Sequence, residues 1–390
     1  MSPGPRKVAV VGVALSDCGR VDTATPYALH AQAARRALAD SGLDKEVVDG
    51  LASAGLGTLA PLEVGEYLGL RPTWVDSTGV GGSTWEVMAA HAADAIAAGH
   101  ANAVLLVYGS TARADLKAGR RRANLSFGTR GPAQFEMPYG HTLVAKYAMA
   151  ARRHMHQYGT TLEQFADVAV QTRANAAHNP QAMYRDPITV DDVLGGPLIA
   201  DPFTKLHCCI RSDGGCAVLL AAQEYVADTA KPPAWVLGAG TAVSHTTMSE
   251  WADFTVSPAA VSGRRAFERA GVTPQDIEVA ELYDAFTYMT LVTLEDLGFC
   301  AKGEGGAFVE GGRLLIGGEL PVNTDGGGLS ACHPGMRGLF LLVEAVRQLR
   351  GEVEAGRQVR KDGGRLPRLA VASGTGGWFC SSGTVVLGRD

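Results

Sequence analysis

The chain contains an internal repeat, and this feature constrains its fold more than any other. The segment RRALADSGLDKEVVD at residues 35–49 returns as RRAFERAGVTPQDIE at residues 264–278. Three features recur at one constant offset. They are Arg-Arg-Ala, the glycine that stops each amphipathic run, and a later apolar position. An apolar segment precedes each copy, VAVVGVAL in one case and AWVLGAG in the other. Self-similarity at so long a period indicates a duplicated domain rather than a solenoid of short repeats.

The hydrophobic pattern of the first half predicts alternating strands and helices. Strands are expected at 8–14, up to Val75 and at 103–107, and helices at 29–41 and 83–98, each helix being stopped by a glycine. The strands are apolar throughout, which is typical of a parallel sheet covered by helices on both faces. The sequence therefore predicts an α/β fold built from βαβ units.

Residues 111–211 break this rhythm. They begin with a polar, glycine-bearing stretch and continue with two amphipathic segments that predict helices at 141–157 and 162–177. We interpret them as an insertion over one face of the core, after which a strand at 216–222 closes the first half. The expected organisation is an N-terminal half at 1–110 and 212–230, an inserted loop domain at 111–211, and a C-terminal half at 231–390.

Charge and cysteine usage narrow the possible functions. A formal net charge of -5 speaks against nucleic acid as the main partner. No apolar run reaches the length of about 18 residues that a membrane-spanning helix needs. The seven cysteines include no C-x-x-C pair, and the histidines lack metal-ligand spacing, so we expect neither a disulfide framework nor a metal site. A reducing cytoplasm is the simplest location.

Four short segments stand in an order that is similar to one known family. They are TGVGGSTWE at 78–86, ELYDAF at 281–286, GGGLSACHPG at 326–335 and ASGTGG at 372–377. Together with the duplication and the mid-chain insertion, they resemble the active-site blocks of the thiolase superfamily over essentially the whole chain. The resemblance implies a thiolase fold, in which duplicated βαβαβαββ halves form a five-layer α-β-α-β-α core with an inserted loop domain.

The blocks differ from the family pattern at both of its reactive cysteines. Counting back from the segment Ala95-Ile96-x-x-Gly99 places the nucleophile position at Gly82, and the acid/base cysteine position falls on Ala372. A thiolate is needed to hold an acyl group as a thioester. The chain keeps the family's histidine, His333, but has neither thiol.

This pattern, with LLVYGS, DPITVDDVL and HPGMRG, is similar to the lipid-transfer-protein branch related to sterol-carrier-protein-x thiolases. The resemblance implies a carbon–carbon lyase, most simply a retro-aldol cleavage of a 3-hydroxyacyl-CoA with a steroid or other lipid side chain. Coenzyme A would be part of the substrate, with no covalently bound cofactor. A homodimer joined at the sheet edge of the first half and a small zinc-ribbon/OB-fold partner are also implied. Steroid-cleaving aldolases of the branch have tyrosine where this chain has His333.

Backbone N–H groups form the first part of the candidate site. Those of Gly82 and Ser83 lie at the expected start of a helix, where the helix dipole favours negative charge. With the N–H groups of Gly374 and Gly376 in the fourth block, they would bind the thioester or enolate oxygen. A simple glycine turn with Ser83 as helix N-cap is the alternative.

Five side chains complete the candidate site. His333, in a turn made tight by proline and glycine, could act as base or hydrogen-bond donor. Tyr283 could donate to an oxyanion, and Asp284 could orient a water or His333, or else cap the following helix. Tyr288 is either a second phenol of the site or a core residue. Cys332 is a weaker nucleophile candidate because neighbouring residues in a turn rarely point the same way.

Two other functions stay open at this stage. The chain could be a thiolase or acyltransferase with a relocated nucleophile, or a non-catalytic scaffold that binds acyl-CoA or lipid. The basic run at 117–123 could contact the phosphates of coenzyme A, because arginine suits phosphate geometry, or it could be a solvated loop.

Overall fold

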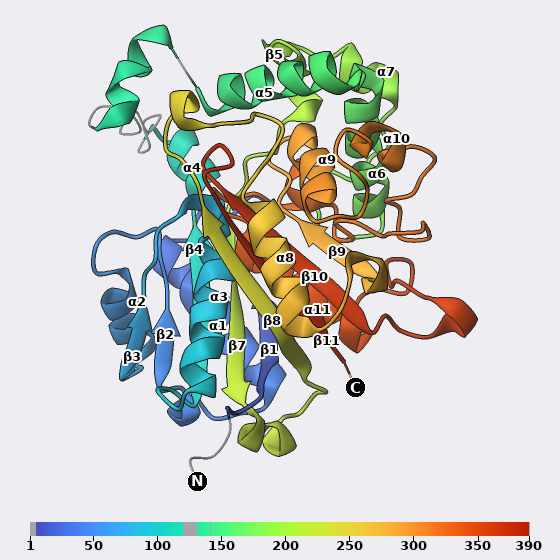
Figure 1. Cartoon of the computed structure of the whole chain (residues 1–390). Coiled ribbons are helices and arrows are strands. Elements are labelled where there is room, and N and C mark those ends of the chain that lie inside the picture. Colours follow the sequence, from blue (N-terminus) through green and yellow to red (C-terminus); the bar gives the residue numbers. More distant parts are fainter. Residues whose placement is uncertain (1–4, 120–130, 141, 390) are drawn as a thin grey trace.

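The computed structural model describes residues 5–119, 131–140 and 142–389. Its centre is a nine-stranded sheet in the order β3-β2-β4-β7-β1-β8-β11-β10-β9 (Figure 1). Its strands are β1 (Val8–Leu15), β2 (Gly50–Ala52), β3 (Trp74–Asp76), β4 (Ala103–Ser110), β7 (Gly214–Ala222), β8 (Ala234–Val243), β9 (Val279–Leu282), β10 (Leu369–Gly376) and β11 (Ser381–Gly388). A separate hairpin joins β5 (Leu198–Ala200) to β6 (Phe203–Thr204).

The strand order confirms the duplication. Outward from the centre, β1, β7, β4 and β2 of the first half correspond to β8, β11, β10 and β9 of the second. In the second half, a parallel bridge between Ala280 of β9 and Val322 takes the position that corresponds to β3 in the first half. The halves are joined because β1 and β8 pair antiparallel, Ala9 opposite Trp235, so that one sheet runs through both.

The expectation of a parallel sheet is met only in part. β2 is parallel to β3 and β4, and β9 is parallel to β10. In contrast, β7 and β11 are antiparallel to both of their neighbours. For β11 the reason is connectivity, because only four residues separate it from β10, which permits a hairpin but no crossover helix. Because β7 is buried along its whole length, its apolar sequence resembles that of a parallel strand.

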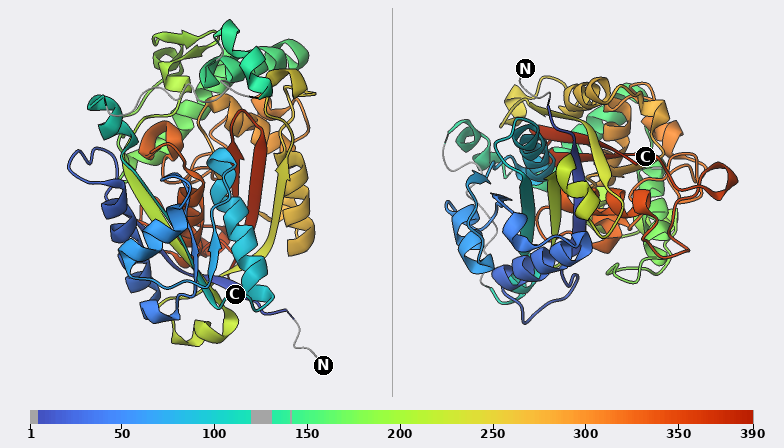
Figure 2. Two further views of the ribbon diagram at one scale, coloured as in Figure 1. Left: turned by 90° about the vertical axis from the view of Figure 1, so that its left-hand side faces the viewer. Right: turned by 90° about the horizontal axis from the view of Figure 1, so that it is seen from below.

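Helices cover the sheet and fill the space between its two halves (Figure 2). α1 (Pro26–Ser41) packs on β1, β4 and β7, and α8 (Ala259–Ala270) packs on β8 and β11. α3 (Thr84–Ala97) and α11 (Gly338–Arg350) contact strands of both halves and each other. The five-layer arrangement is therefore confirmed. The glycines that end α1 and α8, Gly42 and Gly271, have φ of 75° and 68°, the left-handed conformation of a helix C-terminus.

α2 (Ala60–Leu68) packs against α1 and β2. The remaining helices gather at one end of the sheet (Figure 1). They are α4 (Ala112–Lys117), α5 (Leu143–Tyr158), α6 (Leu162–Ala177), α7 (Val190–Leu194), α9 (Thr287–Asp296) and α10 (Gly305–Val309). α6 has the expected bounds, and α5 begins two residues later than expected. Residues 120–123 of the basic run lie outside the described residues. In the described part of the chain, no helix is long and apolar enough to cross a membrane.

Candidate active site

The four sequence blocks meet where α3 begins and where β9 and β10 end. A short 3-10 turn, Gly81–Ser83, leads into α3 and packs against β10. Tyr283 follows β9, and its N–H donates to the carbonyl oxygen of Ser373 on β10 at 3.0 Å. The third block forms a π-helical turn, Gly327–Ala331, that carries the chain to His333. α6 of the inserted region packs against this turn.

A side chain at position 82 would overlap the ring of Tyr283. A Cβ atom on Gly82 would lie 2.5 Å from the Cζ and Cε2 atoms of Tyr283 and 2.3 Å from the carbonyl oxygen of Thr375. Non-bonded carbon atoms pack at about 3.5–4.0 Å, so residue 82 has no room for a side chain while this ring is in place. The phenol therefore occupies the volume into which a nucleophilic side chain at position 82 would point.

Tyr283 and His333 form a hydrogen-bonded pair. The phenol oxygen is 3.1 Å from Nε2 of His333, and the rings are perpendicular. Burial, reinforced by the charge of Arg337, lowers the pKa of His333 to about 4. Burial also raises the pKa of Tyr283 well above its usual value. Both groups are therefore neutral near pH 7, and the phenol O–H donates to Nε2 in the tautomer that carries its proton on Nδ1.

Asp284 acts on the backbone of the third block. Its carboxylate accepts the N–H groups of Gly328 at 2.7 Å and Leu329 at 3.2 Å, and Arg337 lies 3.6 Å away. Burial raises its pKa to about 7, against the opposing effect of these partners. Gly328 stands between this carboxylate and His333, because a Cβ there would be 3.0 Å from atoms of both. Asp284 thus holds the turn before His333 and does not cap the following helix.

Ser83 contributes only its backbone to the site. Its side chain is fully buried, and its Oγ lies 2.7 Å from Oγ of Ser381. It makes no capping bond to α3, and the hydroxyl of Thr84 instead accepts the N–H of Val80 at 3.0 Å. Ser83 therefore stands at the N-cap position without a side-chain capping bond, and its hydroxyl is bonded to that of Ser381.

Gly374 and Gly376 allow the fourth block to touch the start of α3. A Cβ on Gly376 would lie 1.8 Å from the carbonyl oxygen of Val80, and one on Gly81 would lie 2.9 Å from Cα of Gly376. The two backbones are in direct contact beside Gly82. Because the first N–H groups of a helix have no partner within it, such an end is suited to an anionic oxygen.

Tyr288 belongs to the core. It is fully buried, its O–H donates to the carbonyl oxygen of Phe254 at 2.5 Å, and its ring packs against Tyr147, Phe165 and Phe379. Of the two interpretations that the sequence left open, the structure supports packing. Tyr288 makes no contact with the Tyr283–His333 pair that would give it a part in proton transfer.

The environment of the Cys332 thiol does not suit a nucleophile. Its Sγ lies 3.1 Å from Oγ of Ser212, and the side chain is buried. The neighbouring thiol of Cys18, together with burial, raises the pKa of Cys332 well above its usual value. A thiol that stays protonated is a poor nucleophile.

We expect Cys332→Ala to keep kcat/KM for acyl-CoA cleavage within roughly threefold of the parent protein, because the reactive form of this thiol is suppressed. The measurement is steady-state turnover, with mass spectrometry of the parent protein after substrate addition. An acyl group found on Cys332, or a loss of more than roughly 100-fold, would instead identify a relocated nucleophile.

Two buried groups of the site were missed by the sequence analysis. Arg337 binds Asp325 at 2.5 Å and the carbonyl oxygen of Cys332 at 2.8 Å, and so fixes the chain on both sides of His333. Glu86 lies fully buried in the first turn of α3. The available signal for Glu86 was its position, since it is the one carboxyl in the otherwise apolar run TWEVMAA.

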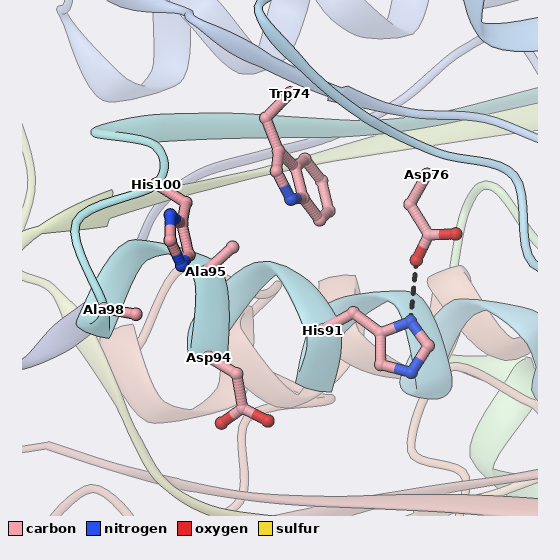
Figure 3. Close-up of a pocket in the computed structure, with 7 residues that line it drawn as sticks. All are labelled: Trp74, Asp76, His91, Asp94, Ala95, Ala98 and His100. Carbon is pink, nitrogen blue, oxygen red and sulfur yellow. Dashed lines mark hydrogen bonds and ion pairs between the residues drawn. The ribbon is translucent and has the colours of Figure 1, made fainter.

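A surface hollow of about 530 Å³ lies apart from this site, on β3 and α3 (Figure 3). His91 is half exposed there, and its Nδ1 lies 2.8 Å from Oδ2 of Asp76, while the rings of Trp74 and His100 face the other end of the hollow. Among the described residues, no group of three or more histidine, cysteine, aspartate or glutamate side chains is arranged to hold a metal ion.

Comparison with known proteins gives consistent relatives. Residues 240–389 match a family model described as thiolase C-terminal domain-like. The chain is 34% identical to a steroid side-chain-cleaving aldolase of Thermomonospora curvata, with 100% of both chains covered. It is also 34% identical to a 17-hydroxy-3-oxo-4-pregnene-20-carboxyl-CoA lyase of Mycobacterium tuberculosis, over 88% of this chain and 92% of that one. The solved Ltp2-ChsH2(DUF35) aldolase has a TM-score of 0.88 and 32% identity, covering 99% and 98% of the respective chains.

Proposed function

Since this chain belongs to the thiolase superfamily, in the branch of the sterol-carrier-protein-2-like thiolases and the steroid side-chain aldolases, we propose that it cleaves a carbon–carbon bond of an acyl-CoA by a retro-aldol reaction. The observation that carries the proposal is the shared space of Gly82 and Tyr283. A thiolase keeps a thiolate in that space, whereas this chain has a phenol bonded to an imidazole. Proton transfer is the chemistry that such a pair performs.

The proposed substrate is a 3-hydroxyacyl-CoA. Tyr283 accepts the proton of the 3-hydroxyl group and passes its own proton to Nε2 of His333. The bond between C2 and C3 then breaks, its electron pair moves to C2, and a ketone or aldehyde forms at C3. The enolate of the shortened acyl-CoA takes the proton back at C2 through the same pair. No electrons are gained or lost overall, and no cofactor takes part.

The enolate intermediate requires donors for its oxygen. We propose that they are the N–H groups at the start of α3, next to Gly82, and that of Gly374 on β10, which belong to two blocks whose backbones are in contact. Donors aimed at developing negative charge stabilise a transition state by roughly 3–4 kcal/mol each. This part of the mechanism needs only backbone, which is why it is compatible with the loss of both thiols.

The acyl tail is proposed to be a steroid or other lipid side chain. Support comes from the relatives, whose names specify a steroid side chain and a pregnene-carboxyl-CoA. We further propose a small zinc-ribbon/OB-fold protein as partner, supported by the likeness to an aldolase named jointly with ChsH2(DUF35). A homodimer is proposed through β3, the terminal strand of the sheet, where Val75 is 47% exposed.

The variant His333→Ala tests the function. With a panel of 3-hydroxyacyl-CoAs and the partner protein present, we expect kcat/KM to fall by roughly 100-fold, because the phenol loses its proton acceptor. Binding of the acyl-CoA, measured by calorimetry, should stay within roughly threefold because the oxyanion donors are unchanged. Binding without cleavage by the parent protein, with every acyl-CoA tested, would instead indicate a scaffold.

A further inference from the structure

Glu86 is a buried carboxyl without a hydrogen-bond partner. It lies one helical turn after Gly82 on α3 and is fully buried. Neither of its carboxyl oxygens makes a hydrogen bond to any residue that the structure describes. Burying an unpartnered polar group costs several kcal/mol, and an isolated charge costs more. Such a group has a stability cost that its own contacts do not offset.

Three glycines make the space that this carboxyl occupies. A Cβ on Gly374 would lie 2.0 Å from its Oε2, and one on Gly338 would lie 2.4 Å from the same atom. A Cβ on Gly383 would lie 2.7 Å from Cβ of Glu86. The carboxyl thus packs against the backbone of β10 in the oxyanion block and against the start of α11, just after the His333 segment. The helix of the first block therefore places this carboxyl against the fourth block and against the helix that follows the third.

The surroundings favour the neutral form of this carboxyl. Burial raises the pKa of Glu86 from 4.5 to about 8. On β10 and β11 the glycines Gly374 and Gly383 pack against it. Its charge would act on the phenol of Tyr283 and the thiol of Cys216, neither of which supplies positive charge. Arg337, just before α11, is already bonded to Asp325. The start of α11 favours an anion, but it makes no hydrogen bond to Glu86.

We propose that Glu86 is a positioning residue that must be a neutral carboxylic acid for turnover. In this form it holds the start of α3 against β10 and α11 without adding charge. Once ionised, it places a negative charge beneath the backbone donors that receive the enolate oxygen and close to the phenol of Tyr283. Both effects oppose the developing charge of the transition state. The inference rests on the proposed function, because the enolate is the intermediate of that reaction.

The test is the pH profile of the variant Glu86→Gln, which is uncharged at every pH and similar in shape. In the parent protein, kcat/KM should fall roughly tenfold per pH unit above about pH 8, because the anion forms as the pH rises through the pKa. In the variant this fall should be absent, with activity near pH 7 within roughly threefold of the parent. Glu66→Gln, at an exposed position on α2, is the matched control and should keep the parent profile.

Thermal unfolding without substrate provides a second readout. Folding raises the pKa of Glu86 from 4.5 to about 8. The contribution of its protonated form to the free energy of unfolding is therefore complete below about pH 4.5 and is lost as the pH rises to about 8. The melting temperature of Glu86→Gln minus that of the parent should therefore rise over this interval and then level off. The same difference for the control Glu66→Gln should show no such rise.

Either of two results would overturn the proposal: an alkaline fall that persists in Glu86→Gln, or a stable variant that is inactive at every pH. A melting-temperature difference that does not change with pH would contradict the neutral buried state. This last measurement needs no turnover, so it also distinguishes failure of the inference from failure of the retro-aldol function.

Discussion

Replacing Tyr283 with phenylalanine should lower kcat/KM for acyl-CoA cleavage by roughly 1000-fold, the midpoint of the range for loss of a general acid–base group. The hydroxyl is the only atom removed, and it is the one bonded to Nε2 of His333. The ring would still fill the space over Gly82, so the fold should be retained. Because Tyr283 acts on the substrate directly, its loss should cost more than the loss of His333 behind it.

The measurement is steady-state cleavage of a 3-hydroxyacyl-CoA, with substrate binding followed separately by calorimetry. The matched control is Tyr288→Phe, which removes a buried phenol oxygen bonded to the carbonyl of Phe254. That change should cost about 1–3 kcal/mol of unfolding free energy and leave kcat nearly unchanged. Equal loss of activity in both variants would argue that Tyr283 serves packing alone.

Introducing a cysteine at Gly82 should abolish cleavage and should not create a thiolase. The new Cβ would overlap the ring of Tyr283 and the carbonyl oxygen of Thr375, at 2.5 and 2.3 Å. Relief requires the ring to move, which separates the phenol from His333, or the backbone of β10 to shift. Overpacking of this kind costs about 1–3 kcal/mol of unfolding free energy. We expect a loss of activity of at least roughly 1000-fold, because proton transfer needs the two groups at hydrogen-bond distance.

The control lies in the same loop. A Cβ on Gly79 meets no atom within 4 Å, so Gly79→Cys should change neither the melting temperature nor kcat/KM appreciably. The double variant Gly82→Cys/Tyr283→Ala should recover part of the lost stability, since the ring that causes the overlap is gone. Additive effects of the two changes on stability would show that they do not share this space.

Local sequence patterns predicted many of the helices and strands. The repeated Arg-Arg-Ala segments and their glycine stops predicted α1 and α8, because an apolar period of one helical turn and a left-handed glycine are properties of neighbouring residues. Strand direction was not predictable in the same way. β7 is apolar because it is buried on both faces, and burial gives the same composition to parallel and antiparallel strands.

The candidate site shows the same division. The motif around His333 identified a residue that the structure places against the phenol of Tyr283. Asp284 was also identified, and the structure shows its carboxylate accepting the backbone N–H groups of Gly328 and Leu329. Glu86 carried no motif, because its enclosure by glycines from β10, β11 and α11 depends on three segments that are distant in the chain.

By itself the sequence determined that this chain is a duplicated α/β protein with four blocks that resemble those of the thiolases, and that glycine stands where the resemblance places the nucleophile. Only the tertiary structure decided what occupies the vacated space. Gly82 lies in the turn before α3 in the first half and Tyr283 follows β9 in the second, and their contact exists because α3 packs between the two halves of the sheet. Because two side chains cannot fill the same volume in a close-packed interior, the phenol at 283 requires glycine at 82. Neither segment reveals this dependence by itself.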